Sequence, residues 1–208
     1  MQTMSIAVVG GGLAGCECAL HLARAGHSVT LFEQKPAHRS AAHISDHLAE
    51  LVCSNSLRSD ELTSGVGLLK AEMRALGSRF MEAADACRVP AGKALAVDRE
   101  AFARQMSQLV ESEANIRLVR HQVQSLDDAV LEPFRGEGRA IVVAAGPMAS
   151  DGLSASLAGV LGEKHCYFYD AIAPIVWTHS LNMDVVFRAS RYGQENGEGE
   201  GEGDYLNC

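Results

Sequence analysis

The chain has 208 residues, of which 47% are hydrophobic and 21% are charged, and its formal net charge at pH 7 is −8. This composition is typical of an ordinary soluble globular protein, with one good-sized domain or one domain and part of a second. No apolar run approaches the roughly 20 residues that cross a bilayer, and the N-terminus lacks the basic flank and cleavage site of a signal peptide. We therefore expect a cytoplasmic protein without membrane contact.

The cysteines and the distribution of charge bear on the cellular compartment and on a nucleic-acid partner. The six cysteines, at positions 16, 18, 53, 87, 166 and 208, form no CxxC pair, which fits a reducing compartment and mostly buried thiols. Five acidic residues lie within 192–208, where Lys and Arg are absent. Because the rest of the chain is near neutral, its charge neither supports nor excludes a nucleic-acid partner.

Residues 6–33 carry a complete nucleotide-binding pattern. A β-type run at 6–9 leads into Gly10-x-Gly12-x-x-Gly15, a stretch of helical spacing follows, and a second β-type run at 29–32 ends in Glu33. In such a unit the first glycine permits a tight turn, the second lets backbone approach a pyrophosphate, and the third lets helix and strand pack closely. The helix N-terminus attracts the phosphates, and the acid accepts hydrogen bonds from a ribose diol. The predicted cofactor-binding residues are Gly10, Gly11, Gly12, Leu13, Ala14, Gly15 and Glu33.

The residues around this motif favour FAD over NAD. Ala19 is small where the helix must lie against the sheet, and Gly26 ends the helix before the second strand. With the terminal Glu33, the extended pattern resembles the FAD-binding domains of the glutathione reductase type. We therefore predict an α/β fold built on a glutathione-reductase-type FAD-binding Rossmann domain. An NAD domain, or an α/β domain with an accidental glycine-rich turn, remains the alternative.

The elements that follow also have recognisable signals. We predict a helix at about 61–86 with an irregularity at Gly77, a break at 89–92, and a helix from its N-cap Asp98 to about 113. Strands are expected near 116–119 and 141–144, and the second has the features of a central parallel strand whose carboxyl end meets the cofactor. A short helix at 151–161 and strands within 166–177 and 184–190 complete the pattern.

These elements predict two units. Residues 1–165 form the FAD-binding Rossmann-like domain, with a helical insertion at about 40–95, and residues 166–208 begin a second, β-containing insert domain. The segment 193–204 ends in GEGEGEGD. Because it is charged, rich in glycine and unable to bury a core, we expect it to be a flexible surface loop.

Cys53 is the residue most suggestive of chemistry. It is followed by Ser54, Asn55 and Ser56, with Arg58 five residues on, and this polar setting can stabilise a thiolate. Because the two residues before it, at 51 and 52, are apolar, a buried and inert thiol is the alternative.

Two further groups of polar residues carry weaker signals. The histidines at 38, 43 and 47 include an i, i+4 pair, but no acidic or thiol partner falls into register, so we expect no metal site. A set of cations after Cys53 offers candidate phosphate contacts, although scattered basic residues on a helix more often form a solvated face. The set comprises Arg58, Lys70, Arg74 and Arg79.

Longer segments of the chain resemble the folate- and FAD-dependent tRNA (uracil-5-)-methyltransferase family, which is related to the flavoproteins that modify the tRNA wobble uridine. The segments with this resemblance are AAHISDHLAELVCSNSLRS at 41–59, VGLLKAEMRALGS at 66–78, RVPAGKALAVDRE at 88–100, AAGPMASDGL at 144–153, YFYDAIAPIV at 167–176 and the final YLNC. The resemblance implies an enzyme that carries FAD, takes a one-carbon unit from 5,10-methylenetetrahydrofolate and uses NAD(P)H to reduce the flavin. It also implies methylation at C5 of uridine 54 in the T loop of tRNA, with Cys53 as a functional cysteine.

The sequence departs from the family pattern in three places. Lys93 stands where the family has a second glycine, in a loop expected near the cofactor, and a glycine–glutamate insert precedes Tyr205. Members of the family also continue for about as long again beyond YLNC. We therefore expect the C-terminal half of the family to be absent and the 208 residues alone to have little activity. An inactive truncated FAD-binding homologue and an NAD-dependent oxidoreductase are the alternative functions.

Overall fold

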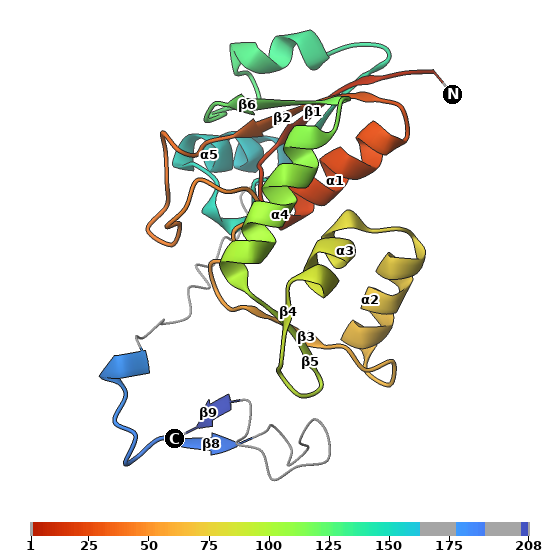
Figure 1. The fold of residues 1–208 in the computed structure, drawn as a ribbon. Helices are drawn as coiled ribbons and strands as arrows, with labels where there is room; N and C mark the ends of the chain where they lie inside the picture. Colours follow the sequence, from red (N-terminus) through yellow and green to blue (C-terminus); the bar gives the residue numbers. More distant parts are fainter. Residues whose placement is uncertain (1, 163–177, 190–204, 208) are drawn as a thin grey trace.

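A parallel four-stranded sheet forms the centre of the computed structural model, which describes residues 2–162, 178–189 and 205–207. Its strand order is β6-β2-β1-β7 (Figure 1). Val9 lies between Phe32 and Val143 in the register, so the carboxyl ends of three strands meet at one edge of the sheet. This arrangement confirms the predicted α/β Rossmann-type fold. The strands are β1 (Ser5–Val9), β2 (Ser28–Glu33), β6 (Ile116–Arg120) and β7 (Arg139–Val143).

Two helices, α1 (Leu13–Arg24) and α4 (Arg99–Ser112), pack on one face of this sheet. Their buried residues form one apolar cluster with Val8 and Leu31 of the sheet, and Leu20 and Phe102 are the largest fully buried members from the two helices. Apolar positions at a spacing of three and four produce this contact.

The opposite face is covered by a 3₁₀ helix, η1 (Ala129–Phe134), and by α5 (Asp151–Leu161). Here the buried side chains include Ala7, Val9 and Phe32 from the strands, with Leu131 and Leu153 from the two helices. Because successive strand residues point to opposite faces, β1 must be apolar throughout to bury both. A continuous run at 6–9 is therefore what the fold requires.

The insertion between β2 and α4 contains a sheet as well as the expected helices. The predicted helix at 61–86 is two helices, α2 (Gly65–Ala75) and α3 (Arg79–Ala86), separated at Gly77, whose φ is +74°. One strand before these helices and two strands after them form an antiparallel sheet in the order β3-β5-β4. Its strands are β3 (Ser56–Ser59), β4 (Arg88–Val89) and β5 (Ala94–Val97).

β7 lies at an edge of the sheet, so its prediction as a central strand is wrong for the described residues. It pairs with β1 alone among them, and its side chains are half-buried or exposed. The apolar run at 141–144 reflects helices on both faces of the strand, and such a pattern carries no information about its neighbours within the sheet.

The remaining described elements are short. A 3₁₀ turn, η2 (Gly146–Met148), follows β7, another, η4 (Thr178–Ser180), opens the second described stretch, and β8 (Phe187–Ala189) pairs antiparallel with β9 (Tyr205–Asn207). The strand expected within 166–177 and the loop at 193–204 lie outside the described residues. Where the structure describes the chain, none of its helices has the length and apolarity to cross a bilayer.

The cap of α4 supplies a test of the local structure. Asp98 accepts a hydrogen bond from the backbone N–H of Ala101 at 2.9 Å, as its sequence position predicts. We expect Asp98→Ala to lower the free energy of unfolding by about 1 kcal/mol because this N–H loses its partner. Asp98→Ser, which keeps an oxygen acceptor, should lose much less. Urea unfolding measures both, and equal losses would contradict the role of the cap.

Candidate functional site

The glycine turn between β1 and α1 is closely packed on two sides and open on the third. Gly10 has a φ of +110°, and a Cβ there would lie 2.6 Å from the carbonyl oxygen of Ala144. A Cβ on Gly15 would lie 1.8 Å from the carbonyl oxygen of Gly10, whereas one on Gly12 would meet nothing within 4 Å. Two of the glycines are therefore required by the packing of the protein, and the third faces open space.

The N-terminus of α1 opens onto that space. Gly12 occupies the N-cap position without a side-chain hydrogen bond, and the first turn of the helix carries no acidic residue. The positive end of the helix dipole is thus not compensated by a side chain of its own first turn. Such an end, with no side chain at its N-cap, is suited to an anion.

Glu33 lies buried beside the turn, at the end of β2. One carboxylate oxygen accepts from the N–H of Gly11 at 2.9 Å, and the other accepts from the N–H of Lys35 at 2.8 Å. A Cβ on Gly11 would lie 2.5 Å from the Glu33 carboxylate. Gly11 is therefore needed for this contact, which no part of the glycine motif by itself predicts.

A cavity of about 320 Å³ opens at this carboxyl edge of the sheet. Glu33 and every predicted residue of the turn except Gly15 line it, and Gly15 lies buried behind them. Most of the remaining wall comes from the segment 144–150 after β7, from the segment between β2 and β3, and from the segment after β6, and Val9, Phe32 and Leu153 complete it. The side chains from the last two segments that sequence reasoning missed are Gln34, His43, Glu50, Val52, His121 and Val123.

A buried ion pair joins Glu50 of this wall to Lys35. The ammonium of Lys35 lies 3.0 Å from the Glu50 carboxylate, and the two side chains are 3% and 7% exposed. Burial acts to raise the pKa of Glu50, but the hydrogen bond from the Ile44 N–H and the Lys35 charge hold it below its usual range. Burial, together with the charge of Lys35, lowers the pKa of His43. In the sequence, only the presence of two charged residues, Lys35 and Glu50, in the irregular stretch after β2 could have suggested this ion pair.

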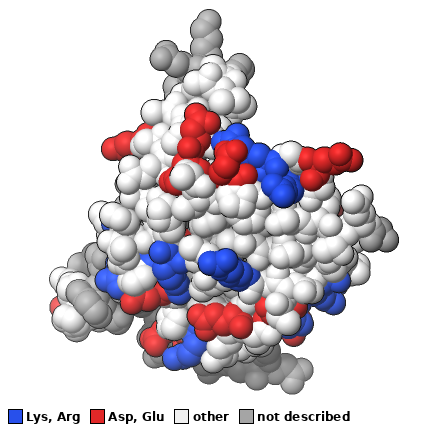
Figure 2. Space-filling model, turned by 90° about the horizontal axis from the view of Figure 1, so that it is seen from above, with Lys and Arg blue, Asp and Glu red and all other residues white. Residues whose placement is uncertain are grey.

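Most of the candidate phosphate contacts are engaged within the protein. Arg74 forms ion pairs with Asp60 at 2.9 Å and with Asp85 at 2.7 Å. On the face shown in Figure 2, basic side chains lie among acidic ones. Lys70 is buried and donates to the carbonyl of Ser59, while Arg79 pairs with Glu82. Of the four candidates, Arg58 is exposed and has no hydrogen-bond or ion-pair partner for its side chain among the described residues.

Lys93 does not line this cavity, and the expectation that its loop lies near the cofactor stays a prediction. It occupies the turn between β4 and β5, and its ammonium lies 2.9 Å from the carboxylate of Glu61. The described residues also contain no cluster of three or more His, Cys, Asp or Glu side chains that could hold a metal ion.

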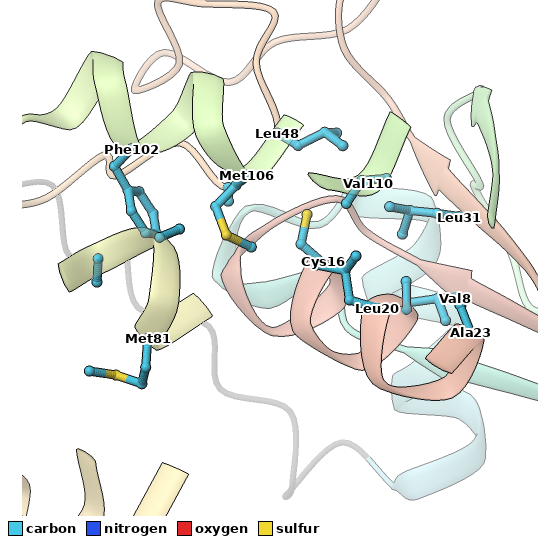
Figure 3. Close-up of a cluster of buried hydrophobic side chains, with 14 of the residues drawn as sticks. Val8, Cys16, Leu20, Ala23, Leu31, Leu48, Met81, Phe102, Met106 and Val110 are labelled. Atoms are coloured by element: carbon cyan, nitrogen blue, oxygen red, sulfur yellow. The ribbon is translucent and has the colours of Figure 1, made fainter. Parts of the chain in front are cut away.

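The described cysteines differ in environment. Cys16 is fully buried among Leu20, Met106 and Val110 (Figure 3), and burial, with the charge of Glu33, raises the pKa of its thiol to about 12. Cys18 and Cys87 are partly exposed, so the expectation of mostly buried thiols is wrong for this part of the chain. Cys53 is exposed. It follows Val52 on the cavity wall but does not itself line the cavity, so the alternative of a buried thiol does not apply.

The two glycines with opposite surroundings provide a matched test of this geometry. We expect Gly15→Ser to lower the free energy of unfolding by about 1–3 kcal/mol or more, because the new Cβ overlaps the Gly10 carbonyl. The same change at Gly12 should alter stability by about 0.5 kcal/mol or less, since the Cβ meets open space and Ser is a good N-cap. Urea titrations compare the two, and similar losses would show that the turn is packed differently.

Comparisons with known proteins identify the family. The family model described as Glucose inhibited division protein A matches residues 5–208. A relative from Lawsonia intracellularis, named methylenetetrahydrofolate–tRNA-(uracil-5-)-methyltransferase TrmFO, is 58% identical over 208 residues, which are 100% of this chain and 45% of the relative. Proteins of the same name from Nitratidesulfovibrio vulgaris (strain Hildenborough) and Syntrophus aciditrophicus are 62% and 48% identical, over 97% and 98% of this chain and 41% and 43% of their own lengths.

The chain therefore spans less than half the length of these curated relatives. The names of the relatives confirm the resemblance that the sequence segments indicated. Because the family model matches nearly the whole chain, the chain belongs to the Glucose inhibited division protein A family.

Proposed function

We propose that this chain is the FAD-binding part of a cytoplasmic enzyme that methylates C5 of the T-loop uridine of tRNA, with 5,10-methylenetetrahydrofolate as carbon donor. The observation that carries the proposal is the match, at 58% identity over the whole chain, to a relative named for that reaction. On this proposal residues 1–165 form the FAD domain and 166–208 begin a second domain. NAD(P)H is the proposed source of electrons.

The residues at the cavity suit FAD. The open backbone at Gly12 and the bare start of α1 would hold the pyrophosphate, because N–H groups and a positive dipole end converge there. Glu33 would accept hydrogen bonds from the adenosine ribose. Each of its oxygens already accepts one backbone N–H, and a carboxylate has lone pairs to spare for further donors. When bound, the flavin supplies hydride chemistry to the reaction.

Cys53 is the proposed nucleophile or proton-transfer group toward uracil. C5 of uracil is a poor nucleophile until a thiolate adds at C6, so a cysteine near the base serves this reaction. The thiol of Cys53 is exposed and follows a residue of the cavity wall, so a base swung out of a folded RNA loop can reach it. Arg58, exposed five residues further on, is the remaining candidate for an RNA phosphate contact.

The alternative functions make different demands. An inactive homologue would bind FAD without methyl transfer, and an NAD-dependent oxidoreductase would bind no flavin at all. The family match and the names of the relatives favour neither. Flavin absorbance of the purified protein distinguishes the proposed enzyme from an NAD-dependent oxidoreductase. Transfer of labelled methyl to unmodified tRNA distinguishes it from an inactive FAD-binding homologue.

The cofactor assignment has a direct test at Gly12. We expect Gly12→Val to abolish retention of FAD while the protein stays folded, because the new side chain occupies the space in front of the helix N-terminus. Gly159→Val on α5 is the matched control, since a Cβ there also meets nothing within 4 Å but lies away from the cavity wall. Flavin absorbance measures the retention of FAD, and circular dichroism measures whether the protein is folded. A folded Gly12→Val protein with full flavin content would overturn the assignment.

The role of Cys53 is tested in a chain extended to the length of the relatives. We expect Cys53→Ala to keep its fold and flavin but to lose methyl transfer by about three orders of magnitude or more, because the covalent route ends with the nucleophile. Cys87→Ala, at the end of α3, removes a partly exposed thiol elsewhere and should keep full activity. Labelled methyl transferred to tRNA is the measurement, and near-normal turnover of Cys53→Ala would make its thiol dispensable.

A further inference from the structure

The segment between β2 and β3 is held by one buried ion pair, that of Lys35 and Glu50. We propose that this pair positions Cys53 relative to the cavity, so that its removal slows the reaction without releasing the flavin. The inference rests on the proposed function, and it names two positioning residues rather than catalytic ones.

The Lys35–Glu50 pair binds the backbone of the residues that lie between its two members. The ammonium of Lys35 donates to Glu50 and to the carbonyl of His47. The second oxygen of Glu50 accepts from the N–H groups of Ile44 and Ser45, at 2.8 and 3.2 Å. One carboxylate therefore receives three donors from different directions, which fixes its orientation and the course of residues 44–50.

The residues on either side of Glu50 are hydrogen-bonded to the glycine turn and to α4. The N–H of Ala49 donates to the carbonyl of Gly11 in the glycine turn at 2.8 Å. The N–H of Leu48 donates to Ser107 of α4 at 2.8 Å, and the carbonyl of Leu51 accepts from Arg99. Ala49 is held at a φ of +51°, a conformation that costs a non-glycine residue free energy and persists only where surrounding contacts determine it.

This anchored stretch leads directly to the thiol of Cys53. Glu50 and Val52 both line the cavity, and Cys53 is the next residue. Past Leu51 the chain is irregular until β3 begins at Ser56. The last fixed points before the thiol are therefore Glu50 and its two neighbours, so the direction in which Cys53 leaves the cavity wall depends on the pair.

An ion pair has a use here that an apolar pair lacks. Replacing a buried pair by apolar groups of similar size is often neutral for stability, whereas removing one partner leaves an unpaired buried charge. A role in stability alone therefore predicts that a double, uncharged variant behaves like the parent protein. A role in positioning predicts that the same variant folds but places Cys53 poorly, since the directional hydrogen bonds are lost.

The test uses the double variant Lys35→Met/Glu50→Gln in the chain extended to the length of the relatives. We expect normal flavin content and a kcat for methyl transfer reduced roughly 10- to 100-fold, with the KM for tRNA changed much less. Lys35→Arg keeps a cation for Glu50 and should recover most of the kcat. The matched control is the double variant Arg104→Met/Glu100→Gln, which removes an exposed ion pair of α4 and should leave kcat unchanged.

A second readout is independent of methyl transfer. The rate at which iodoacetamide alkylates Cys53 is followed by peptide mass spectrometry, and we expect it to change severalfold in the double variant but not in the α4 control. If the double variant does not fold, Glu50→Gln, which keeps the size and one oxygen of the side chain, takes its place. Unchanged kcat per bound flavin and unchanged alkylation would overturn the inference. If the parent protein lacks methyl transfer, the proposed function fails, and the alkylation rates still decide whether the pair positions Cys53.

Discussion

The contact between the glycine turn and the first turn of α1 determines the position of the other parts of the cavity. Gly15 approaches Gly10 so closely that a single added carbon would overlap the Gly10 carbonyl oxygen. This closeness directs the start of α1 toward the carboxyl edge of the sheet and leaves the backbone at Gly12 facing open space. An anion can therefore reach the positive end of the helix with no side chain in between.

The second constraint acts on the irregular chain between β2 and β3. A loop that lies against the core must satisfy its backbone polar groups, and here Lys35, Glu50, Ser107 and Arg99 provide partners for it. The pKa of Glu50 is lowered in the folded state, so its contribution to stability is present at neutral pH. That contribution is lost only as the pH falls through the lowered pKa, on the acid side of the ordinary carboxyl range.

The sequence predicted those features that depend on local geometry. The strand, turn, helix, strand and acid of residues 6–33 were expected at their observed positions, because each step needs a particular residue type at a fixed spacing. The cap at Asp98 followed from the same kind of reasoning. The hydrogen bond between Gly11 and Glu33 and the Lys35–Glu50 pair were not predicted, since they join residues 22 and 15 positions apart through the fold.

The position of β7 and the sheet in the insertion show the same limit. An apolar run reports that both faces of a strand are covered, and it is silent on the order of strands. The short strand at 94–97 pairs with the segment at 56–59, some 40 residues earlier, an arrangement that no local pattern encodes. The exposure of Cys53 likewise depends on how the loop is anchored, so its apolar neighbours at 51 and 52 misleadingly suggested burial.

A crystal structure of the chain, extended to the length of its relatives and grown with FAD, tests the central claim most directly. We expect the pyrophosphate within hydrogen-bond distance of the backbone N–H groups at Gly12 and Leu13, and a ribose hydroxyl on the carboxylate of Glu33. FAD bound elsewhere, with the space in front of Gly12 left to solvent, would contradict it.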